Sequence, residues 1–128
     1  MTHAFLFLPE IIRFSVDKGK PGVYALGEIV DGKFIVGYVG RSDSCVQTRL
    51  LSHNHLYEFS YFCFQYARNP AEAYLKETEL WHTCVDFDIP IVNKIHPDSP
   101  ANAKLSCPYC QSAKIINQSL KNDWLQAG

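Results

Sequence analysis

The sequence has no apolar run long enough to cross a membrane and no excess of charge of either sign. No stretch reaches the roughly 18 apolar residues that a membrane-spanning helix needs. The short apolar run before Pro9 and Glu10 has no basic segment ahead of it, unlike a signal peptide. Twelve Lys and Arg against thirteen Asp and Glu give a formal net charge of −1, which excludes a strongly basic protein that coats nucleic acid but permits a local basic face. We therefore expect a soluble, cytoplasmic protein with no membrane partner.

The chain also lacks the cysteine pattern of a disulfide-stabilised domain. Its cysteines are odd in number and irregularly spaced, at Cys45, Cys63, Cys84, Cys107 and Cys110. This pattern favours reduced thiols, with a metal site as an alternative use for some of them. Cys45 and Cys63 are interpreted as packing residues.

What the chain does contain is enough apolar material for one core and many phenol rings. Its 128 residues are typical of a single domain, and 47% hydrophobic against 20% charged residues indicates a folded protein. Seven Tyr and eight Phe are present. Such rings bury a large area, and Tyr adds a hydroxyl that can also serve chemistry.

The first half of the chain is predicted to form a β-hairpin followed by a short helix. Residues 3–14 are apolar and fit either a strand or a short helix. Residues 23–30 and 34–39 fit two strands, and the Asp31-Gly32 pair between them is typical of a type I′ turn. A helix over about 45–53 follows, for which Ser42, Asp43 or Ser44 is the expected cap.

The second half is predicted to add a strand and a longer helix. Residues 58–67 are rich in aromatic residues and fit a third strand. Asn69 as cap, Pro70 at the first helical position and Glu72 two residues later predict a helix that ends near Cys84. A short extended piece over 91–95 and a last helix over 111–125 complete the expected order.

One acidic residue lies on the apolar side of the longer helix. At 100° per residue, Glu77 falls in the middle of a stripe whose other members are Ala73, Tyr74, Leu80, Trp81 and Cys84. An unpaired buried carboxylate is costly. Glu77 is therefore expected to pair with an Arg, bind a metal ion or lie at the edge of a cleft.

Two tripeptides on the predicted hairpin combine with residues further along the chain. Gly22-Val23-Tyr24 begins one strand and Tyr38-Val39-Gly40 ends the other. They are followed by Arg49, by Glu77-Thr-Glu-Leu80 and by Pro90-Ile-Val-Asn93. Together, in this order, they cover residues 22–93, and the sequence resembles the GIY-YIG nuclease family.

The resemblance implies an α+β fold, with a small three-stranded antiparallel sheet flanked by helices. Residues 1–95 would form the catalytic domain. Residues 96–128 would form a C-terminal extension with a short helical tail that packs on the same domain. The implied activity is metal-dependent endonuclease cleavage of phosphodiester bonds in DNA.

The resemblance also implies roles for single residues. Glu77 would hold one Mg²⁺ or Mn²⁺, a hard cation that suits a carboxylate. Tyr24 is the first candidate to take or relay the proton of the attacking water, which requires nearby cations to lower its pKa. Arg49 would supply that charge and bind the phosphate, and Tyr38 would position the water or the phosphate.

Further residues are candidates for supporting roles. His53, four residues after Arg49, is an auxiliary acid or base, with packing as the alternative. Asn93 would orient groups by hydrogen bonds, or serve only as a turn amide. Gly40 and Arg41 are candidates for substrate binding, with a solvated loop charge as the alternative for Arg41.

The tail contains Cys107-Pro-Tyr-Cys110, which supplies two of the four ligands of a structural Zn²⁺ site. His96, His82 or Cys84 would complete such a site, and two unligated thiols are the alternative. The motif also resembles a glutaredoxin active site, but a thioredoxin-like fold must be built mostly after that motif, and only eighteen residues follow it. A disulfide or redox role is the third alternative.

The sequence alone leaves two functional classes open. One is the endonuclease, for which a homodimer or a protein partner would supply the specificity that a short chain lacks. The other is a non-catalytic module that keeps the fold and binds nucleic acid or protein.

Overall fold

In the computed structural model, the described part of the chain comprises residues 3–53, 58–87, 89–92 and 97–100. It has an α+β fold with one antiparallel sheet of strand order β1-β4-β2-β3. The α+β class expected from the sequence is confirmed. The elements in chain order are β1 (Phe5–Leu6), α1 (Pro9–Ser15), β2 (Gly22–Val30), β3 (Lys33–Ser42), α2 (Val46–Leu51), β4 (Tyr61–Tyr66) and α3 (Pro70–Asp86).

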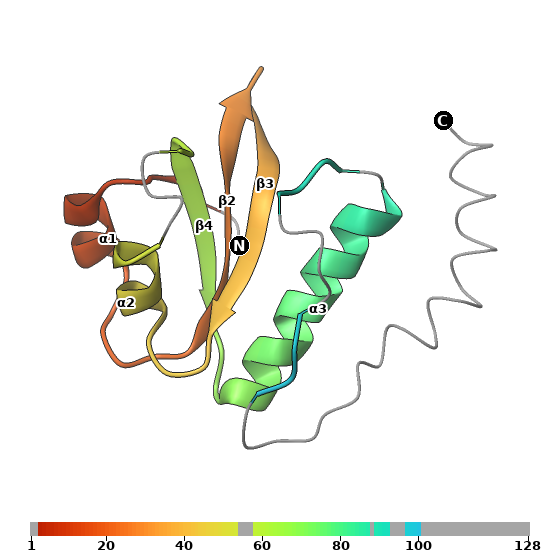
Figure 1. The fold of residues 1–128 in the computed structure, drawn as a ribbon. Helices are drawn as coiled ribbons and strands as arrows, with labels where there is room; N and C mark the ends of the chain where they lie inside the picture. Colours follow the sequence, from red (N-terminus) through yellow and green to blue (C-terminus); the bar gives the residue numbers. More distant parts are fainter. Residues whose placement is uncertain (1–2, 54–57, 88, 93–96, 101–128) are drawn as a thin grey trace.

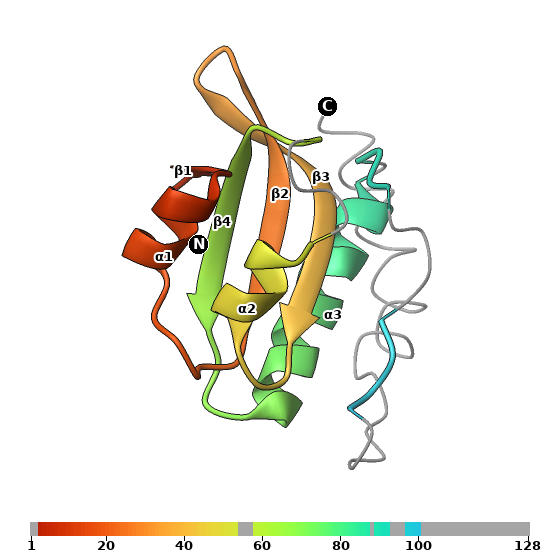
Figure 2. The ribbon, with the colours of Figure 1, turned by 60° about the vertical axis from the view of Figure 1, so that its left-hand side comes forward.

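The helices lie on both faces of the sheet. Helices α1 and α2 cover one face, and α3 covers the other (Figures 1 and 2). Each face has its own hydrophobic cluster. The first is built around Tyr24, Leu26 and Phe62, and the second contains Val39 and Trp81. The face of the sheet on which a side chain lies therefore determines which helices it contacts.

The hairpin of β2 and β3 forms as predicted but contains one irregularity. Asp31 and Gly32 have φ angles of 52° and 75°, as a type I′ turn requires at both central positions. Leu26 pairs with Tyr38, whereas Gly27 pairs with Val36. One residue of β3 therefore has no paired residue on β2, and this irregularity is a β-bulge.

The sheet has four strands rather than the three expected from the sequence. The additional strand comes from the N-terminal segment, where Phe5 pairs with Phe62 of β4. Phe5 also packs against Phe62 and Phe64, with ring centroids 5.5 and 5.8 Å away. The strand ends quickly because Pro9 starts a helix, where its missing N–H costs nothing. The segment that fitted either a strand or a helix thus contains both.

The predicted cap of α3 is confirmed, and that of α2 is wrong. Asn69 Oδ1 accepts from the N–H of Glu72 at 2.8 Å, and Pro70 begins α3. Helix α2 is capped instead by Cys45, whose Sγ accepts from the N–H of Thr48 at 3.5 Å. Cys45 is the cap because Ser42 Oγ accepts from the N–H of Cys45 at 3.0 Å and so serves the preceding turn.

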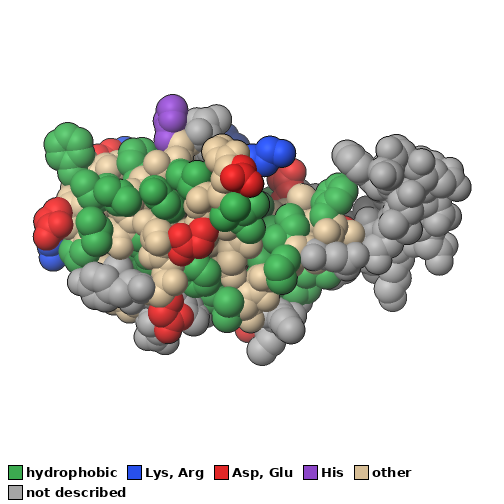
Figure 3. All heavy atoms as spheres, turned by 90° about the horizontal axis from the view of Figure 1, so that it is seen from above, with side chains coloured by type: hydrophobic (Ala, Val, Ile, Leu, Met, Phe, Trp, Pro, Cys, Tyr) green, Lys and Arg blue, Asp and Glu red, His purple; other side chains and the backbone are tan. Residues whose placement is uncertain are grey.

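The end of the molecule that carries the hairpin tip has many exposed apolar side chains. Ile29, Val30 and Ile35 are 42–53% exposed there. Viewed from this end, the described surface shows hydrophobic and acidic side chains with few basic ones (Figure 3). Among the described residues, this end therefore presents no cluster of basic side chains (Figure 3). No helix among the described residues is both long and apolar enough to span a bilayer.

Several predictions from the sequence concern residues outside the described part of the chain. These are Asn93, His96, the Cys107–Cys110 motif and the helix over 111–125. Of the extended piece expected over 91–95, only Ile91 and Val92 are described. The N–H of Val92 donates to the carbonyl of Gly37 at 2.7 Å, which places this segment against the bulge of β3.

Candidate active site at the end of strand β3

The two signature tyrosines lie side by side on the face covered by α1 and α2. Tyr24 pairs with Gly40 across β2 and β3, and Tyr38 pairs with Leu26. Because alternate residues share a face, both rings project the same way. Their centroids are 6.3 Å apart with an interplanar angle of 12°. The register of the hairpin thus brings the two phenol rings together.

Gly40 leaves the space that the hydroxyl of Tyr24 occupies. A Cβ placed on Gly40 would overlap that hydroxyl and would lie 2.5 Å from the Cζ of Tyr24. Tyr24 itself is fully buried. The close approach explains in packing terms why a glycine ends the second tripeptide.

Arg49 extends from α2 to the buried phenol. Its Nε donates to the hydroxyl of Tyr24 at 3.4 Å. That hydrogen bond, with a smaller influence from Tyr38, raises the pKa of Arg49, so the guanidinium stays charged. The short helix α2 thus delivers a permanent positive charge to the tyrosines.

His53 packs edge-on against both tyrosine rings. Its centroid is 5.4 Å from that of Tyr24 and 4.7 Å from that of Tyr38, at angles of 88° and 85°. The ring also contacts Phe7 at 6.5 Å, and the residue is 7% exposed. His53 therefore belongs to the cluster, whereas His55, the next histidine along the chain, lies outside the described residues.

The pKa of Tyr24 is raised, which is opposite to the direction expected for a proton acceptor. Burial is the main cause, because it disfavours the phenolate. The hydrogen bond and charge of Arg49 act to lower the pKa but do not outweigh burial. Tyr24 is consequently a neutral phenol at physiological pH in this structure.

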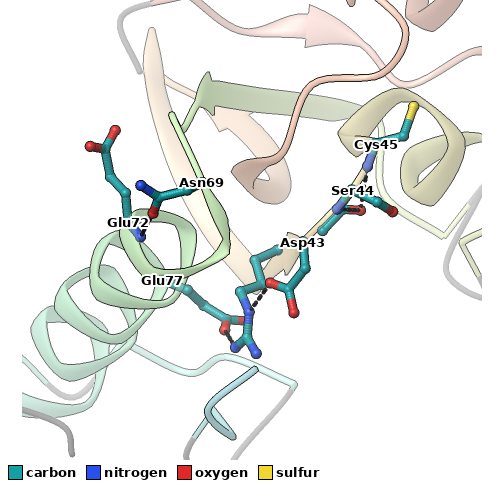
Figure 4. Close-up of polar contacts among 8 residues, drawn as sticks. Asp43, Ser44, Cys45, Asn69, Glu72 and Glu77 are labelled. Atoms are coloured by element: carbon teal, nitrogen blue, oxygen red, sulfur yellow. Dashed lines mark hydrogen bonds and ion pairs between the residues drawn. The ribbon is translucent and has the colours of Figure 1, made fainter. Parts of the chain in front are cut away.

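Glu77 lies on the other face of the sheet and pairs with Arg41. Helix α3 places Glu77 among buried residues, where it is 7% exposed. Its Oε1 accepts from Nη1 of Arg41 at 2.5 Å, and Arg41 Nε donates to Asp43 Oδ1 at 2.8 Å. Figure 4 shows Glu77 and Asp43 pointing toward each other, with dashed lines to the guanidinium between them. The sequence-derived alternative of an Arg partner for Glu77 is therefore confirmed.

The environment of this ion pair affects both partners. Burial raises the pKa of Glu77, and the hydrogen bond from Arg41 opposes that rise. Burial would lower the pKa of Arg41, but its hydrogen bonds to Asp43 and Glu77 more than offset this and raise it. Arg41 also lies over the ring of Tyr74, 5.2 Å from its centroid, a cation–π geometry. Arg41 is thus held in place by several contacts rather than solvated in a loop.

The candidate residues form two groups that meet around the edge strand β3. The tyrosines, Arg49 and His53 face α1 and α2, while Arg41 and Glu77 face α3. The groups interact electrostatically, because the charge of Glu77 raises the pKa of Tyr24 and the charge of Arg49 lowers that of Glu77. Tyr38 and Arg41 belong to the half of β3 that leads away from the hairpin turn, and that end of the strand lies opposite the turn (Figure 1).

The described residues provide few ligands for a metal ion. No group of three or more His, Cys, Asp or Glu that could hold a metal occurs in the described ranges. Glu77 with Asp43 nearby still fits a hard cation that keeps most of its waters, because these two carboxylates already stabilise a positive group between them. Cys84, a candidate zinc ligand, is 1% exposed beside Val39 and Trp81, and burial raises the pKa of its thiol.

Two residues near the site were missed from the sequence in the roles that they have. Asp43, expected as a cap, is a partner of Arg41. Tyr74, expected only as core, supports the guanidinium with its ring. An acid two residues after a basic residue at a strand end was the available signal for Asp43, while the sequence held no signal for Tyr74.

Comparison of the chain with family models, with curated proteins and with solved structures finds no match in any of the three.

Proposed function

We propose that the chain is a metal-dependent DNA endonuclease of the GIY-YIG type, which hydrolyses phosphodiester bonds. The observation that carries the proposal is the packing of Tyr24 against Gly40. Residues separated along the sequence, each from one signature tripeptide, fit each other atom to atom, with Arg49 donating to the same hydroxyl. A purely structural hairpin has no need of a permanently charged guanidinium beside a buried phenol.

The residues can divide the work of hydrolysis among them. Arg49 presents a fixed positive charge with several N–H groups, which suits a phosphate oxygen. The neutral phenol of Tyr24 acts as a relay, accepting a proton from the attacking water while its own hydroxyl proton passes to an oxygen of the bound phosphodiester. Tyr38, less buried than Tyr24, positions the water or phosphate, and His53 holds both rings in place.

Glu77 is the proposed ligand of one Mg²⁺ or Mn²⁺, with waters completing its coordination. When bound, the ion would polarise the phosphate and stabilise the leaving oxygen. Glu77 lies near enough to raise the pKa of Tyr24, and the charge of Arg49 lowers the pKa of Glu77. This proximity supports the assignment. Asn93 remains a proposed orienting group.

Binding to DNA would depend on a small basic patch. Arg41, Arg49 and Lys76 are its proposed members, and the formal net charge of −1 offers no wider attraction. Affinity should therefore be weak and sensitive to salt. A homodimer or a protein partner is the proposed source of specificity, and the cytoplasm the proposed compartment.

Nicking of supercoiled plasmid tests the proposal. Wild type is compared with Glu77→Gln and with Glu79→Gln, which alters an exposed acid on the same helix. We expect Mg²⁺-dependent nicking that falls by about 10²–10³ in Glu77→Gln, since metal-ion stabilisation is worth several kcal/mol, and that persists in Glu79→Gln. Thermal melting checks that each variant is folded.

Nicking by Glu77→Gln at the wild-type rate, or nicking that survives removal of divalent ions with a chelator, would contradict the proposal. The alternative is a non-catalytic module that binds nucleic acid or protein. It predicts no nicking by the wild type under any metal, together with retarded migration of DNA in a gel.

A further inference from the structure

Arg41 is hydrogen-bonded to the carboxylate of Glu77, which is the proposed ligand of the metal ion. Its Nη1 lies 2.5 Å from Oε1 of Glu77, and its Nε lies 2.8 Å from Oδ1 of Asp43. The side chains of Arg41 and Glu77 are only 13% and 10% exposed, whereas that of Asp43 is 38% exposed. The inner contact, to Glu77, is thus the more shielded from water.

A guanidinium and a divalent ion make incompatible demands on the same oxygen. An ion that binds Oε1 of Glu77 competes for the oxygen that already accepts from Nη1 of Arg41, and an ion on either oxygen places a second positive charge beside the guanidinium in a partly buried site, where the two charges repel each other strongly. The hydrogen bond from Nη1 must therefore be broken before direct metal binding. The bond from Nε to Asp43 uses a different nitrogen and a more exposed carboxylate.

We propose that Arg41 competes with the divalent ion for Glu77 and that Asp43 retains the guanidinium when the ion displaces it. This inference rests on the proposed role of Glu77 as a metal ligand. Held by Asp43 through Nε, the guanidinium keeps the donors on its two terminal nitrogens. These donors become available to a phosphate at the moment that the ion arrives, so metal binding and substrate binding reinforce each other.

Mn²⁺ binding measured without DNA tests the competition directly. Titration calorimetry on the whole chain compares wild type with Arg41→Gln, which keeps a polar side chain but removes the competing charge. Arg41→Lys keeps the charge with fewer donors. Arg68→Gln is the matched control, because it removes one positive charge from the exposed pair that Arg68 makes with Glu72.

We expect Arg41→Gln to bind Mn²⁺ about ten- to a hundredfold more tightly, the range for removing a charged hydrogen bond that metal binding must break. Arg41→Lys should lie between wild type and Arg41→Gln, and Arg68→Gln should change the affinity less than twofold. Melting curves establish that the compared variants are folded. If Arg41→Gln does not fold, the tighter binding by Arg41→Lys carries the test.

The outcomes separate this inference from the proposed function. If Glu77→Gln abolishes Mn²⁺ binding but neither Arg41 variant binds more tightly than wild type, the competition is overturned and the metal role of Glu77 stands. An equal gain in Arg41→Gln and Arg68→Gln would also overturn it, because net charge would explain both. If Mn²⁺ binds equally well to Glu77→Gln, or to no variant, the metal role of Glu77 fails and the competition with it.

Discussion

Substitution of Gly40 by Ala tests the link between the second tripeptide and the buried phenol of Tyr24. The added Cβ would lie 2.5 Å from Cζ of Tyr24 and closer still to its hydroxyl. Carbon atoms prefer about 3.5–4.0 Å, so one strand or the ring must move by about 1 Å. The ring has little freedom, because Tyr38 and His53 pack against it.

The expected cost of Gly40→Ala is about 1–3 kcal/mol of unfolding free energy, the usual range for overpacking a core. For a domain of this size that corresponds to a melting temperature lower by about 4–12 °C. The sign of the change in unfolding free energy distinguishes a crowded glycine from one with open space. At an unstrained glycine with open space, alanine stabilises a protein by about 0.4–1 kcal/mol, because it restricts the unfolded chain.

Thermal and urea unfolding, followed by circular dichroism, measure the effect. The double variant Tyr24→Phe/Gly40→Ala serves as the internal control, because loss of the hydroxyl removes the closest contact and leaves the contact with the ring carbon. We expect Gly40→Ala to cost less in the Tyr24→Phe background than in wild type. A Gly40→Ala protein as stable as wild type, or strictly additive effects of the two changes, would refute the packing described here.

Two further predictions follow from perturbed side chains. The raised pKa of Tyr24 favours folding fully below the unfolded pKa near 10, and this contribution is lost as pH rises through the folded pKa. The free energy of unfolding, measured by urea titration between about pH 9 and 11, should therefore fall more steeply for wild type than for Tyr24→Phe, by up to about 1.4 kcal/mol per pH unit, and parallel curves would contradict this. The hydroxyl of Thr48, with backbone N–H groups, lowers the pKa of Cys45 to about 7, so iodoacetamide at neutral pH should alkylate Cys45 before Cys63 and Cys84, whose pKa values burial raises. Peptide mass spectrometry measures the order, Thr48→Val should slow the reaction at Cys45, and an unchanged rate in that variant would argue against the hydroxyl as the cause.

Local signals in the sequence predicted much of the fold. The Asp31-Gly32 turn and the Asn69 cap depend on backbone geometry within a few residues, so the sequence alone is enough to recognise them. The cap of α2 was misassigned because the three candidates have similar intrinsic preference, and Ser42 bonds to the turn before the helix instead. The segment that contains β1 was left open between strand and helix because two strand residues give too short a pattern to separate from the helix that follows.

In the candidate site too, local features were predicted from the sequence and long-range contacts were not. Helical periodicity alone identified Glu77 as a buried acid, because the wheel depends only on spacing. Its partner Arg41 lies 36 residues away on another element, and no local pattern indicates such a contact. The face on which each tyrosine lies was equally undetermined, since it depends on the register of the hairpin.

The bulge in β3 has a consequence for how the two halves of the site are made. Val36 packs with the cluster under α3, yet Tyr38, two residues later, packs with the cluster under α1 and α2. The unpaired position between them is Gly37, where a Cβ would overlap the ring of Phe59. One added residue thus reverses the inward and outward alternation of the strand. If Gly37 were instead paired in regular register, Tyr38 would face α3 and Arg41 would face α1 and α2. A residue that takes part in no chemistry therefore decides which helices the tyrosine and the arginine meet.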